Sequence, residues 1–565
     1  MKFLFVLTII SFSFPSFFLS ACPSDGDKIN SEAIEKVDSD SKKAHINKSV
    51  LSPKPDPFFT ENTSNILIFG GGYSASGNQI SLESNVRYFR KIRDDIGLAN
   101  ASIYTYFADG KDAGRDLQFF DPSFSVPDIN LVFAELFGKT NGIANQYRTN
   151  QLNPNGSSSI ANVDQWFDQI KKSKLTKKNL IYFTGHGGKG DTKNPHNTTA
   201  YLWSNVKLKV ADFVKKLDQL PLKQSTILVM VQCYSGGFAN VLFENGDPKK
   251  EMSKHARAGF FSTIQTRVAA GCTPDIREEN YQEYSTSFWE ALSGESRIGK
   301  KINKPDYNLD GKTSLMEAHS YVSINSNTID IPIKTSDVLL RKFLPDEFKI
   351  KKTTPKKSEP LDKLVDKDLP KLLKRDSNST KPNKTLMLED FEKSILSNWA
   401  NPEEKAIFLG ISKVLNLKED FPGKEIKKLQ EQFKKEREGV QKEKKKALDQ
   451  KNKYRDELRK ILLSKHPEIS NPYHPTTTLL LSTNQKQGIL EIVNQKGIWR
   501  KLLEEKEKAK KLELQRFIIE KQEVKIMRLR RCIENIILAH QLPEKGSLDQ
   551  NKKYNQLISL ERSIF

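Results

Sequence analysis

The fold is decided by two stretches, NLIYFTGHGG (residues 179–188) and STILVMVQCYSGG (residues 225–237). In each, a run of apolar and β-branched residues ends in a turn that carries glycine and one reactive side chain. Two similar runs precede them, NILIF (65–69) before three glycines and IYTYF (103–107) before Ala-Asp-Gly. Continuous apolar runs that alternate with helical patterns are typical of parallel strands buried on both faces. We therefore expect an α/β domain over residues 64–340, with a mostly parallel sheet and helices on both of its faces.

Two reactive side chains, His186 and Cys233, follow neighbouring apolar runs directly. The carboxyl ends of parallel strands form the edge at which ligands bind, so both residues are expected at one site. A thiolate can attack a carbonyl carbon, and an imidazole can raise the thiolate fraction and later protonate the leaving amine. Either residue alone would fit a turn histidine or a buried free cysteine. Their joint placement favours a catalytic pair.

The pattern of His-Gly after one strand and Gln-Cys after another resembles the peptidase clan of caspases, metacaspases, legumains and gingipains. IYFTGHGG is most similar to legumain, and CYSGG is also similar to bacterial metacaspase-like proteins. The resemblance implies a caspase-like fold and a cysteine endopeptidase that passes through a thioester acyl-enzyme. It makes Cys233 the nucleophile and His186 its acid/base partner, with backbone amides of Gly187 and Cys233 as the oxyanion site.

Further segments extend this resemblance to about residues 62–325. AAGCTPD (269–275) resembles the clan's next strand, and EYSTSF (283–288) resembles the segment beside its specificity pocket. Legumains have an Asn near the end of the first strand that orients the His, whereas this chain has Gly70, Gly71 and Gly72 there. Asn78 is the nearest substitute along the chain. No charged pocket residue can be assigned from the sequence, so the residue preferred before the cleaved bond is open.

Two alternatives remain open at this point. Gly70, Gly72 and Ala75 fit a loose dinucleotide-binding pattern, but no clear helix pattern opens on them, and we expect no organic cofactor. The second is a catalytically silent caspase-like lipoprotein, which would act as an interaction or scaffold protein through its basic helical region. A protein or peptide substrate is the partner expected on the first hypothesis.

A second motif, DYNLDGKTSLME (306–317), has the ligand spacing of an EF-hand loop. The spacing predicts a Ca²⁺ site with glycine at the sharp turn. Its expected ligands are Asp306, Asn308, Asp310, the Lys312 carbonyl, Ser314 and Glu317. The alternative is a polar turn that caps the following helix.

The N-terminal segment has the layout of an export signal, with one Lys, an apolar run and small residues. Leu19-Ser20-Ala21-Cys22 resembles the lipobox of bacterial lipoproteins. This implies a signal peptide over 1–21, a lipidated Cys22, and a chain anchored to a membrane of the bacterial cell envelope, outside the cytoplasm. Residues 22–63 are poor in apolar side chains and are expected to form a flexible tether.

The C-terminal region differs in composition. Residues 341–385 read as a linker, and residues 386–565 as a basic helical region. Ile426, Phe433, Val440, Ala447, Tyr454 and Ile461 recur at a seven-residue interval, and a second helical pattern covers about 486–541. Prolines after residue 466 separate the two, so we expect a coiled-coil-like antiparallel hairpin, whose apolar stripe also permits self-association.

Most of the chain's net charge of +21 lies in this region, since residues 331–565 hold 53 Lys and Arg against 35 Asp and Glu. Lys mixed with Glu along helices is typical of a solvated face, so we do not expect nucleic acid as a partner. The four cysteines show no metal-binding spacing. Cys272 is expected to be a packed thiol at a strand end, and Cys532 a buried thiol on the apolar helix face.

Overall fold

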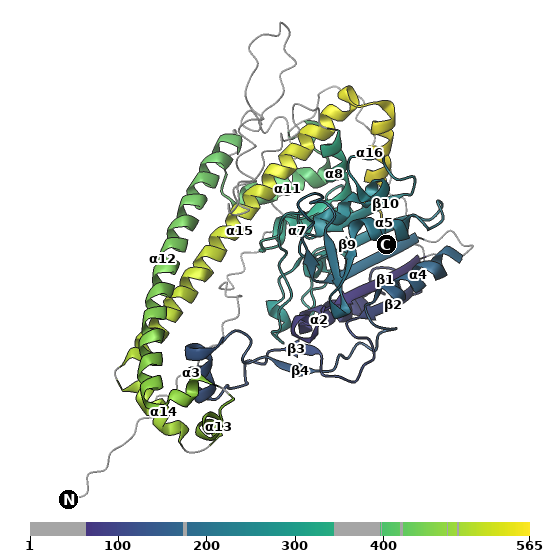
Figure 1. The fold of residues 1–565 in the computed structure, drawn as a ribbon. Helices are drawn as coiled ribbons and strands as arrows, with labels where there is room; N and C mark the ends of the chain where they lie inside the picture. The colour runs from purple at the N-terminus through teal and green to yellow at the C-terminus, as the bar shows by residue number, and fades with distance from the viewer. Residues whose placement is uncertain are drawn as a thin grey trace, which may run out of the picture.

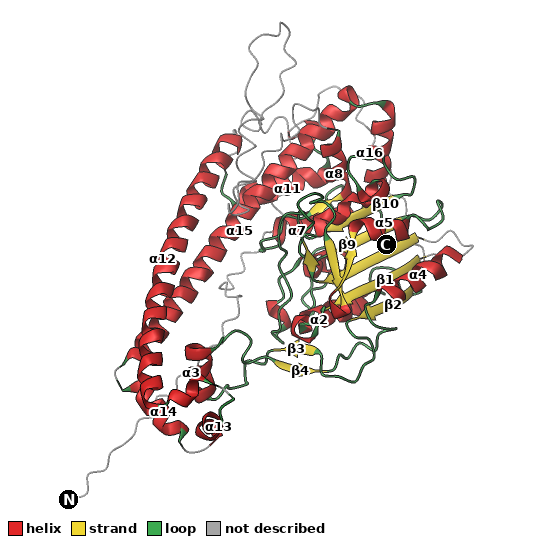
Figure 2. Ribbon diagram, viewed as in Figure 1, coloured by secondary structure: helices red, strands yellow, loops and turns green. Residues whose placement is uncertain are grey.

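The computed structural model describes residues 64–172, 178–343, 396, 398–417, 422–471, 473–482, 485–495 and 497–564. These residues form a mixed α/β body (64–343) and a helical arm (396–564) that lies along one side of it (Figure 1). Figure 2 shows that the strands are confined to the body and that the arm is helical.

The body is built on a six-stranded sheet with the order β11-β10-β9-β5-β1-β2. All neighbouring strands are parallel except β10 and β11, which pair in the antiparallel sense. The strands are β1 (Ser64–Gly71), β2 (Ser102–Phe107), β5 (Lys178–Gly185), β9 (Thr226–Met230), β10 (Arg257–Phe261) and β11 (Ile333–Lys334). The predicted mostly parallel sheet is confirmed.

The apolar runs form strands because both of their faces are covered. In β1, Ile66 and Ile68 point into one core cluster, whereas Leu67 and Phe69 point into the other. Each of these side chains is at most 1% exposed. Burying such a side chain contributes roughly 1.5–3 kcal/mol, so a central strand with no polar face is favoured only inside a layered fold.

Helices from separate parts of the chain cover the two faces of the sheet. One cluster contains side chains of α2 (Ile80–Ile92), α6 (Tyr284–Ser293) and α7 (Leu315–Asn325). The other contains side chains of α4 (Ile160–Lys172) and α5 (Val210–Leu217). The predicted helices on both faces are therefore present.

Shorter elements complete the body. The strands β3 (Leu117–Phe119) and β4 (Gln146–Arg148) pair in the antiparallel sense, and the chain between them contains α3 (Asp128–Phe137). The strands β6 (Gly187–Gly188), β7 (Thr199–Leu202) and β8 (Val206–Lys209) form a small antiparallel sheet. The remaining elements are η1 (Ala75–Gly77), η2 (Trp203–Asn205), η3 (Ser235–Leu242), η4 (Glu244–Gly246), η5 (Glu278–Asn280) and α8 (Thr335–Lys342). The segment 269–275, which was expected to be a strand, has no strand assignment, because β10 ends at Phe261 and the chain then loops back over the sheet edge.

The arm consists of two long helices and several short ones. Its elements are α11 (Pro402–Val414), α12 (Pro422–Lys465), η9 (Pro467–Ser470), α13 (Pro475–Ser482), α14 (Lys486–Asn494), α15 (Ile498–Lys545) and α16 (Leu548–Glu561). The pairs Arg437 with Glu523 and Lys444 with Glu513 show that α12 and α15 run antiparallel. The predicted hairpin is therefore confirmed. The second helical pattern, however, is split at Gly497, whose φ of 64° is left-handed.

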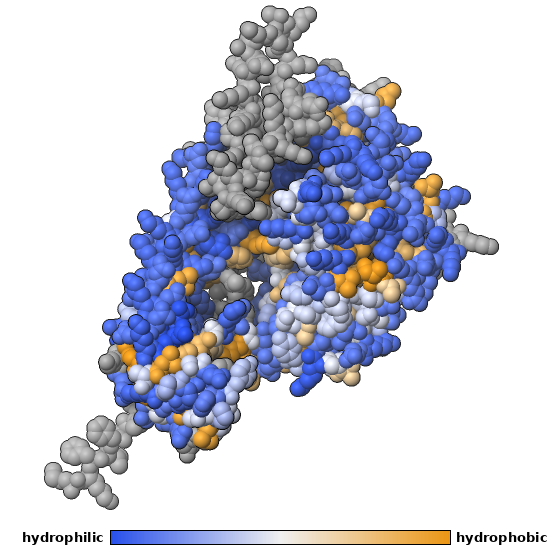
Figure 3. All heavy atoms as spheres, in the orientation of Figure 1, coloured by the Kyte–Doolittle hydropathy of each residue, from blue (hydrophilic) through white to orange (hydrophobic). Residues whose placement is uncertain are grey.

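The arm contacts the body at its tip and at its base, and Glu520 of α15 also pairs with Arg267 of the body. At its tip, apolar side chains of α12, α14 and α15 pack against α3, where buried Glu135 pairs with Lys451 and Lys506. At its base, α11, α15 and α16 contact α7, α8 and β10. Figure 3 shows a mostly hydrophilic surface over the arm in this view, as expected for a solvated charged face.

Several predictions fall outside the described residues. These are the signal peptide 1–21, the lipidated Cys22, the tether 22–63, and the linker 341–385 beyond residue 343. Among the helices that the structure describes, none combines the length and the apolar character needed to cross a bilayer.

Candidate active site

His186 and Cys233 lie at the same edge of the sheet. Their strands β5 and β9 are neighbours, with Phe183 opposite Met230, and each reactive residue follows its register partner by three positions. The loops also touch, because a Cβ atom placed on Gly187 would lie 2.0 Å from the Cys233 carbonyl oxygen. The structure therefore brings the two predicted residues to one place.

The His186 ring is held by the loop that follows β1. Its Nε2 lies 2.7 Å from the Gly77 carbonyl oxygen and 3.0 Å from Gln79 Oε1. A carbonyl oxygen can only accept, so Nε2 carries the proton and donates it, and Nδ1 of the neutral ring is free of a proton. Burial lowers the pKa of His186, and the Gly77 hydrogen bond opposes this effect. The ring is therefore neutral at pH 7 and can accept a proton at Nδ1.

Gly77 and Gln79 were missed by sequence reasoning, and the guess of Asn78 was wrong. The Asn78 side chain accepts from the Gly72 amide at 2.9 Å and donates to Asp116 at 2.8 Å. It braces the loop and does not contact the His186 ring. A backbone carbonyl leaves no mark in the sequence, whereas Gln79, just before α2, is a polar residue that a search around Asn78 could have included.

The Cys233 thiol is partly buried under the segment that follows β10. Its Sγ lies 3.4 Å from the Ala269 amide nitrogen and 3.9 Å from the Ala269 carbonyl oxygen. Burial raises the pKa of Cys233, and the nearby Asp330 carboxylate adds to the rise. The resting cysteine is therefore a thiol, which requires a base when it reacts.

The residue after the thiol adopts a strained conformation. Tyr234 has a φ of 61°, uncommon for a residue with a Cβ, and its amide donates to the Arg267 carbonyl at 2.8 Å. Such outliers persist where their surroundings fix them, and they cluster at functional sites. Glycine is needed at positions 236 and 237 that come after Ser235. A Cβ atom on Gly236 would lie 2.7 Å from the backbone of residues 263–265, and one on Gly237 would lie 2.1 Å from Thr198.

The Gly187 amide is turned away from the small sheet. The Tyr201 amide donates to the His186 carbonyl at 2.9 Å, and Gly187 stands opposite Ala200. Hydrogen-bonded and non-hydrogen-bonded pairs alternate along an antiparallel ladder, so Gly187 belongs to a pair that exchanges no hydrogen bonds. Its N–H is therefore not used in the ladder with β7.

Buried polar atoms without a hydrogen-bond partner gather beneath this edge. They include both amide atoms of Gln232, Oδ2 of Asp330, Oε1 of Glu283, and Nε and Nη1 of Arg297. Burial raises the pKa of Asp330 to about 6 and that of Glu283 to about 7, the latter opposed by Arg297.

Cys272 occupies a different position from the one expected. It lies in a loop with a φ of 57°, and its Sγ is 4.0 Å from the Gly185 carbonyl oxygen. Burial raises its pKa well above the ordinary value. Cys272 is therefore a partly buried thiol packed against the end of β5. Cys532 is 5% exposed within an apolar cluster, as predicted.

The predicted calcium loop has the turn of an EF-hand but not its convergence of ligands. Asp306 accepts from the amides of Asp310 at 3.0 Å and Gly311 at 2.9 Å, and Gly311 has a φ of 80°. The turn therefore has the expected form. Across the described ranges, however, no group of three or more His, Cys, Asp or Glu is arranged to hold a metal ion.

Glu317 explains the difference. It is fully buried, and its carboxylate accepts from the amides of Tyr307 at 2.7 Å and Ser314 at 2.8 Å. Together with Ser314 it forms a capping box at the start of α7. In this arrangement the other expected ligands (Asn308, Asp310, Lys312 and Ser314) act within the turn and the cap, and calcium binding stays a prediction.

Comparisons with known proteins add little to what the site itself shows about function. No family model matches the chain, and no curated protein matches its sequence. Among solved structures, protein GSU0716 from Geobacter sulfurreducens is 12% identical with a TM-score of 0.25, covering 44% of this chain and 85% of its own. The Drosophila initiator caspase Dronc is 9% identical with a TM-score of 0.23, covering 45% of this chain and 74% of its own. TM-scores this low leave the function to be argued from the site.

Proposed function

We propose that the protein is a cysteine endopeptidase of the caspase and legumain type, with Cys233 as nucleophile and His186 as acid/base. The observation that supports it best is the His186 ring, whose Nε2 is held by the Gly77 carbonyl at the strand end beside Cys233. This hydrogen bond fixes both the tautomer and the orientation of the ring. A histidine with a purely structural role in a turn requires neither a fixed tautomer nor a fixed ring orientation.

The reaction follows from these positions. His186 Nδ1 takes the proton of the Cys233 thiol as the sulfur attacks the carbonyl carbon of the scissile peptide. The carbonyl oxygen becomes an oxyanion, to which the amides of Gly187 and Cys233 donate. The tetrahedral intermediate collapses as His186 gives its proton to the leaving amine, and a thioester remains. Water, deprotonated by His186, then hydrolyses the thioester and restores the thiol.

Two buried residues of opposite charge, Glu283 and Arg297, lie near the loop that carries His186. Glu283 and Arg297 lie 3.7 Å apart near the site and partly offset each other. Arg297 also donates to Asn85, which in turn donates to Thr184, two residues before His186. A substrate side chain that reaches this network meets both signs of charge.

The test is cleavage of a diverse peptide library by the purified protein under reducing conditions. We expect cleavage by the wild type, none by Cys233→Ala, and labelling of Cys233 by a cysteine-directed peptide electrophile. Full cleavage by Cys233→Ala would rule out the proposed nucleophile. Retained thermal stability of the variant serves as the folding control.

The second candidate function is a silent caspase-like scaffold that binds partners through the arm. The raised pKa of the Cys233 thiol and its cover by Ala269 favour this reading, since neither promotes attack at rest. It requires that no peptide in the library be cleaved. One efficient cleavage that disappears in His186→Ala would remove it.

Attachment to a membrane through a lipid on Cys22, outside the cytoplasm, remains part of the proposal. It rests on the resemblance of Leu19-Ser20-Ala21-Cys22 to a lipobox. Metabolic labelling with a fatty acid should mark the wild type and leave Cys22→Ser unlabelled.

For the loop 306–317 we propose weak Ca²⁺ binding, in which the Glu317 carboxylate gives up its hydrogen bonds from backbone amides and binds the ion. Calcium should then raise the Tm of the wild type, and Asp306→Ala should abolish this rise.

A further inference from the structure

Two segments of the body flank the Cys233 thiol. The first, residues 267–270, contacts Sγ through Ala269, and the Arg267 carbonyl accepts from the Tyr234 amide at 2.8 Å. The second, residues 326–332, joins α7 to β11 and carries Asp330, whose Oδ1 accepts from the amide of Ala270, the residue next to Ala269. Their positions therefore decide how far the sulfur is covered.

The two segments are fastened to each other. Arg267 Nε donates to the Ile329 carbonyl at 2.9 Å, and the Ala270 amide donates to Asp330 Oδ1 at 2.6 Å. These two hydrogen bonds make the segments one unit. A displacement of either one shifts the cover over Cys233.

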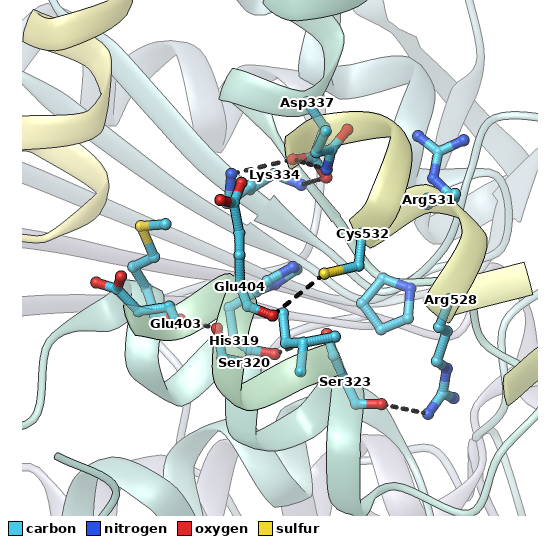
Figure 4. Close-up of a pocket in the computed structure, with 14 residues that line it drawn as sticks. His319, Ser320, Ser323, Lys334, Asp337, Glu403, Glu404, Arg528, Arg531 and Cys532 are labelled. Atoms are coloured by element: carbon cyan, nitrogen blue, oxygen red, sulfur yellow. Dashed lines mark hydrogen bonds and ion pairs between the residues drawn. The ribbon is translucent and has the colours of Figure 1, made fainter. Parts of the chain in front are cut away.

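This unit is held from outside by α15 of the arm. Arg267 Nη2 lies 2.6 Å from Glu520 Oε1, and the Arg528 guanidinium donates to four backbone carbonyls and one hydroxyl at 2.7–3.3 Å. The carbonyls belong to Ser323, Ser326, Thr328 and Asp330. Figure 4 shows Arg528 at the edge of the pocket between α7 and α15, with its contact to Ser323.

The Arg528 hydrogen bonds are strong because they are buried away from solvent. Arg528 is 3% exposed, and it closes the C-terminal end of α7, where helix carbonyls lack partners within the helix. A guanidinium keeps its charge when buried, and its planar fork of donors suits several carbonyls at once. Moving α15 away would leave these carbonyls buried without donors, so the helix and the segment move together.

From these contacts we infer that α15 controls the cover over Cys233, with Glu520, Arg267 and Arg528 as positioning residues. The arm is then a built-in regulator of the site. A change at the arm reaches the thiol through two arginines, without any contact between the arm and the substrate.

The inference predicts two opposite changes of rate in the same variant, which a general loss of stability would not produce. Loosening the cover exposes the sulfur to a small reagent, and it also spoils the geometry that substrate needs. We therefore expect faster alkylation of Cys233 by iodoacetamide and slower peptide cleavage in the same variant. The second readout rests on the proposed function, whereas the first does not.

The variant of choice is Glu520→Ala in the full chain, because Glu520 is partly exposed and its loss spares the core. We expect alkylation of Cys233 at pH 7, followed by peptide mapping, to quicken about threefold to tenfold. The cleavage kcat/KM should fall by a similar factor. Glu520→Gln, which keeps an acceptor oxygen for Arg267, should lie between Glu520→Ala and the wild type.

The matched control is Glu523→Ala on the same helix, since Glu523 pairs with Arg437 of α12 within the arm. It should leave the alkylation rate unchanged. Equal alkylation rates for Glu520→Ala, Glu523→Ala and the wild type would overturn the inference, even if all three proteins cleave nothing. Arg528→Lys, which keeps the charge but loses the fork, should accelerate alkylation at least as much as Glu520→Ala, and an unchanged rate in a folded Arg528→Lys would contradict it.

Discussion

The edge of the sheet that carries His186 and Cys233 and the base of the arm both bury charged groups, but the two regions differ in how these groups are paired. At the base, Arg562 binds Glu403 through two hydrogen bonds at 2.8 and 2.9 Å, and Glu561 accepts from Thr335 and Ser336. At the edge, polar atoms of Gln232 and Asp330 are buried with no partner. Paired buried charges hold elements together, whereas orphan groups cost stability and are retained where a ligand or a reaction uses them.

The largest difference between the two regions is expected at His186, where a substitution should affect the cleavage rate and not the stability. His186→Ala should lower kcat/KM about 10²–10⁴-fold, the usual contribution of a general base, and leave Tm nearly unchanged. Burial lowers the pKa of His186 below its usual 6.5, so the neutral base should persist to mildly acidic pH. The acidic limb of the wild-type pH–rate profile should therefore lie below pH 6.5, and a limb above that value would contradict the assignment.

At the base of the arm, a substitution should lower the stability and leave the cleavage rate nearly unchanged. Glu403→Gln removes the carboxylate that pairs directly with the buried Arg562 guanidinium, so the free energy of unfolding should fall by about 3–5 kcal/mol. Urea unfolding measures the change. Cleavage measured well below the new Tm should stay near the wild-type rate, since neither residue touches the thiol cover. Glu443→Gln, at an exposed residue of α12, is the control and should leave stability nearly unchanged.

Two glycines sharpen the comparison further. Gly187→Ala places a Cβ 2.0 Å from the Cys233 carbonyl oxygen, so the two loops must separate, and we expect about a tenfold or greater loss of kcat/KM. Gly439 of α12 has nothing within 4 Å of its Cβ position. Gly439→Ala should therefore raise stability by up to about 1 kcal/mol through helix propensity. Steady-state kinetics and thermal unfolding of both variants test the contrast.

The smallest effect is expected at Gln79. Gln79→Ala removes one of two acceptors at His186 Nε2 and leaves the Gly77 carbonyl in place. A hydrogen bond of about 1 kcal/mol corresponds to a severalfold change in kcat/KM. We expect kcat to fall more than KM rises, because the residue orients the base and does not bind substrate. Asn78→Ala serves as comparison, and a larger loss there than at Gln79 would contradict the placement of the ring.

The sheet could be predicted from the sequence because its central strands are apolar on both faces, as in Ile66 to Phe69. The meeting of His186 and Cys233 followed from parallel pairing alone. What holds His186 could not be predicted, because the main acceptor is a backbone carbonyl. The contacts of Arg267 and Arg528 were also invisible, since Arg267 meets Glu520 across 253 residues and no local pattern marks such a pair. The heptad stripe predicted the hairpin, but not where it attaches.

The place of Glu561 has a consequence for the order in which the molecule is assembled. The Ser336 amide, at the start of α8, is satisfied by a carboxylate synthesised 225 residues later, and the Leu315 amide at the start of α7 donates to the Ser563 carbonyl. During translation, the ribosome has therefore already made His186 and Cys233 long before it makes the residues that finish the neighbouring helices. Until residues 561 and 563 have been made, a nascent chain therefore lacks these two hydrogen bonds at the starts of α8 and α7.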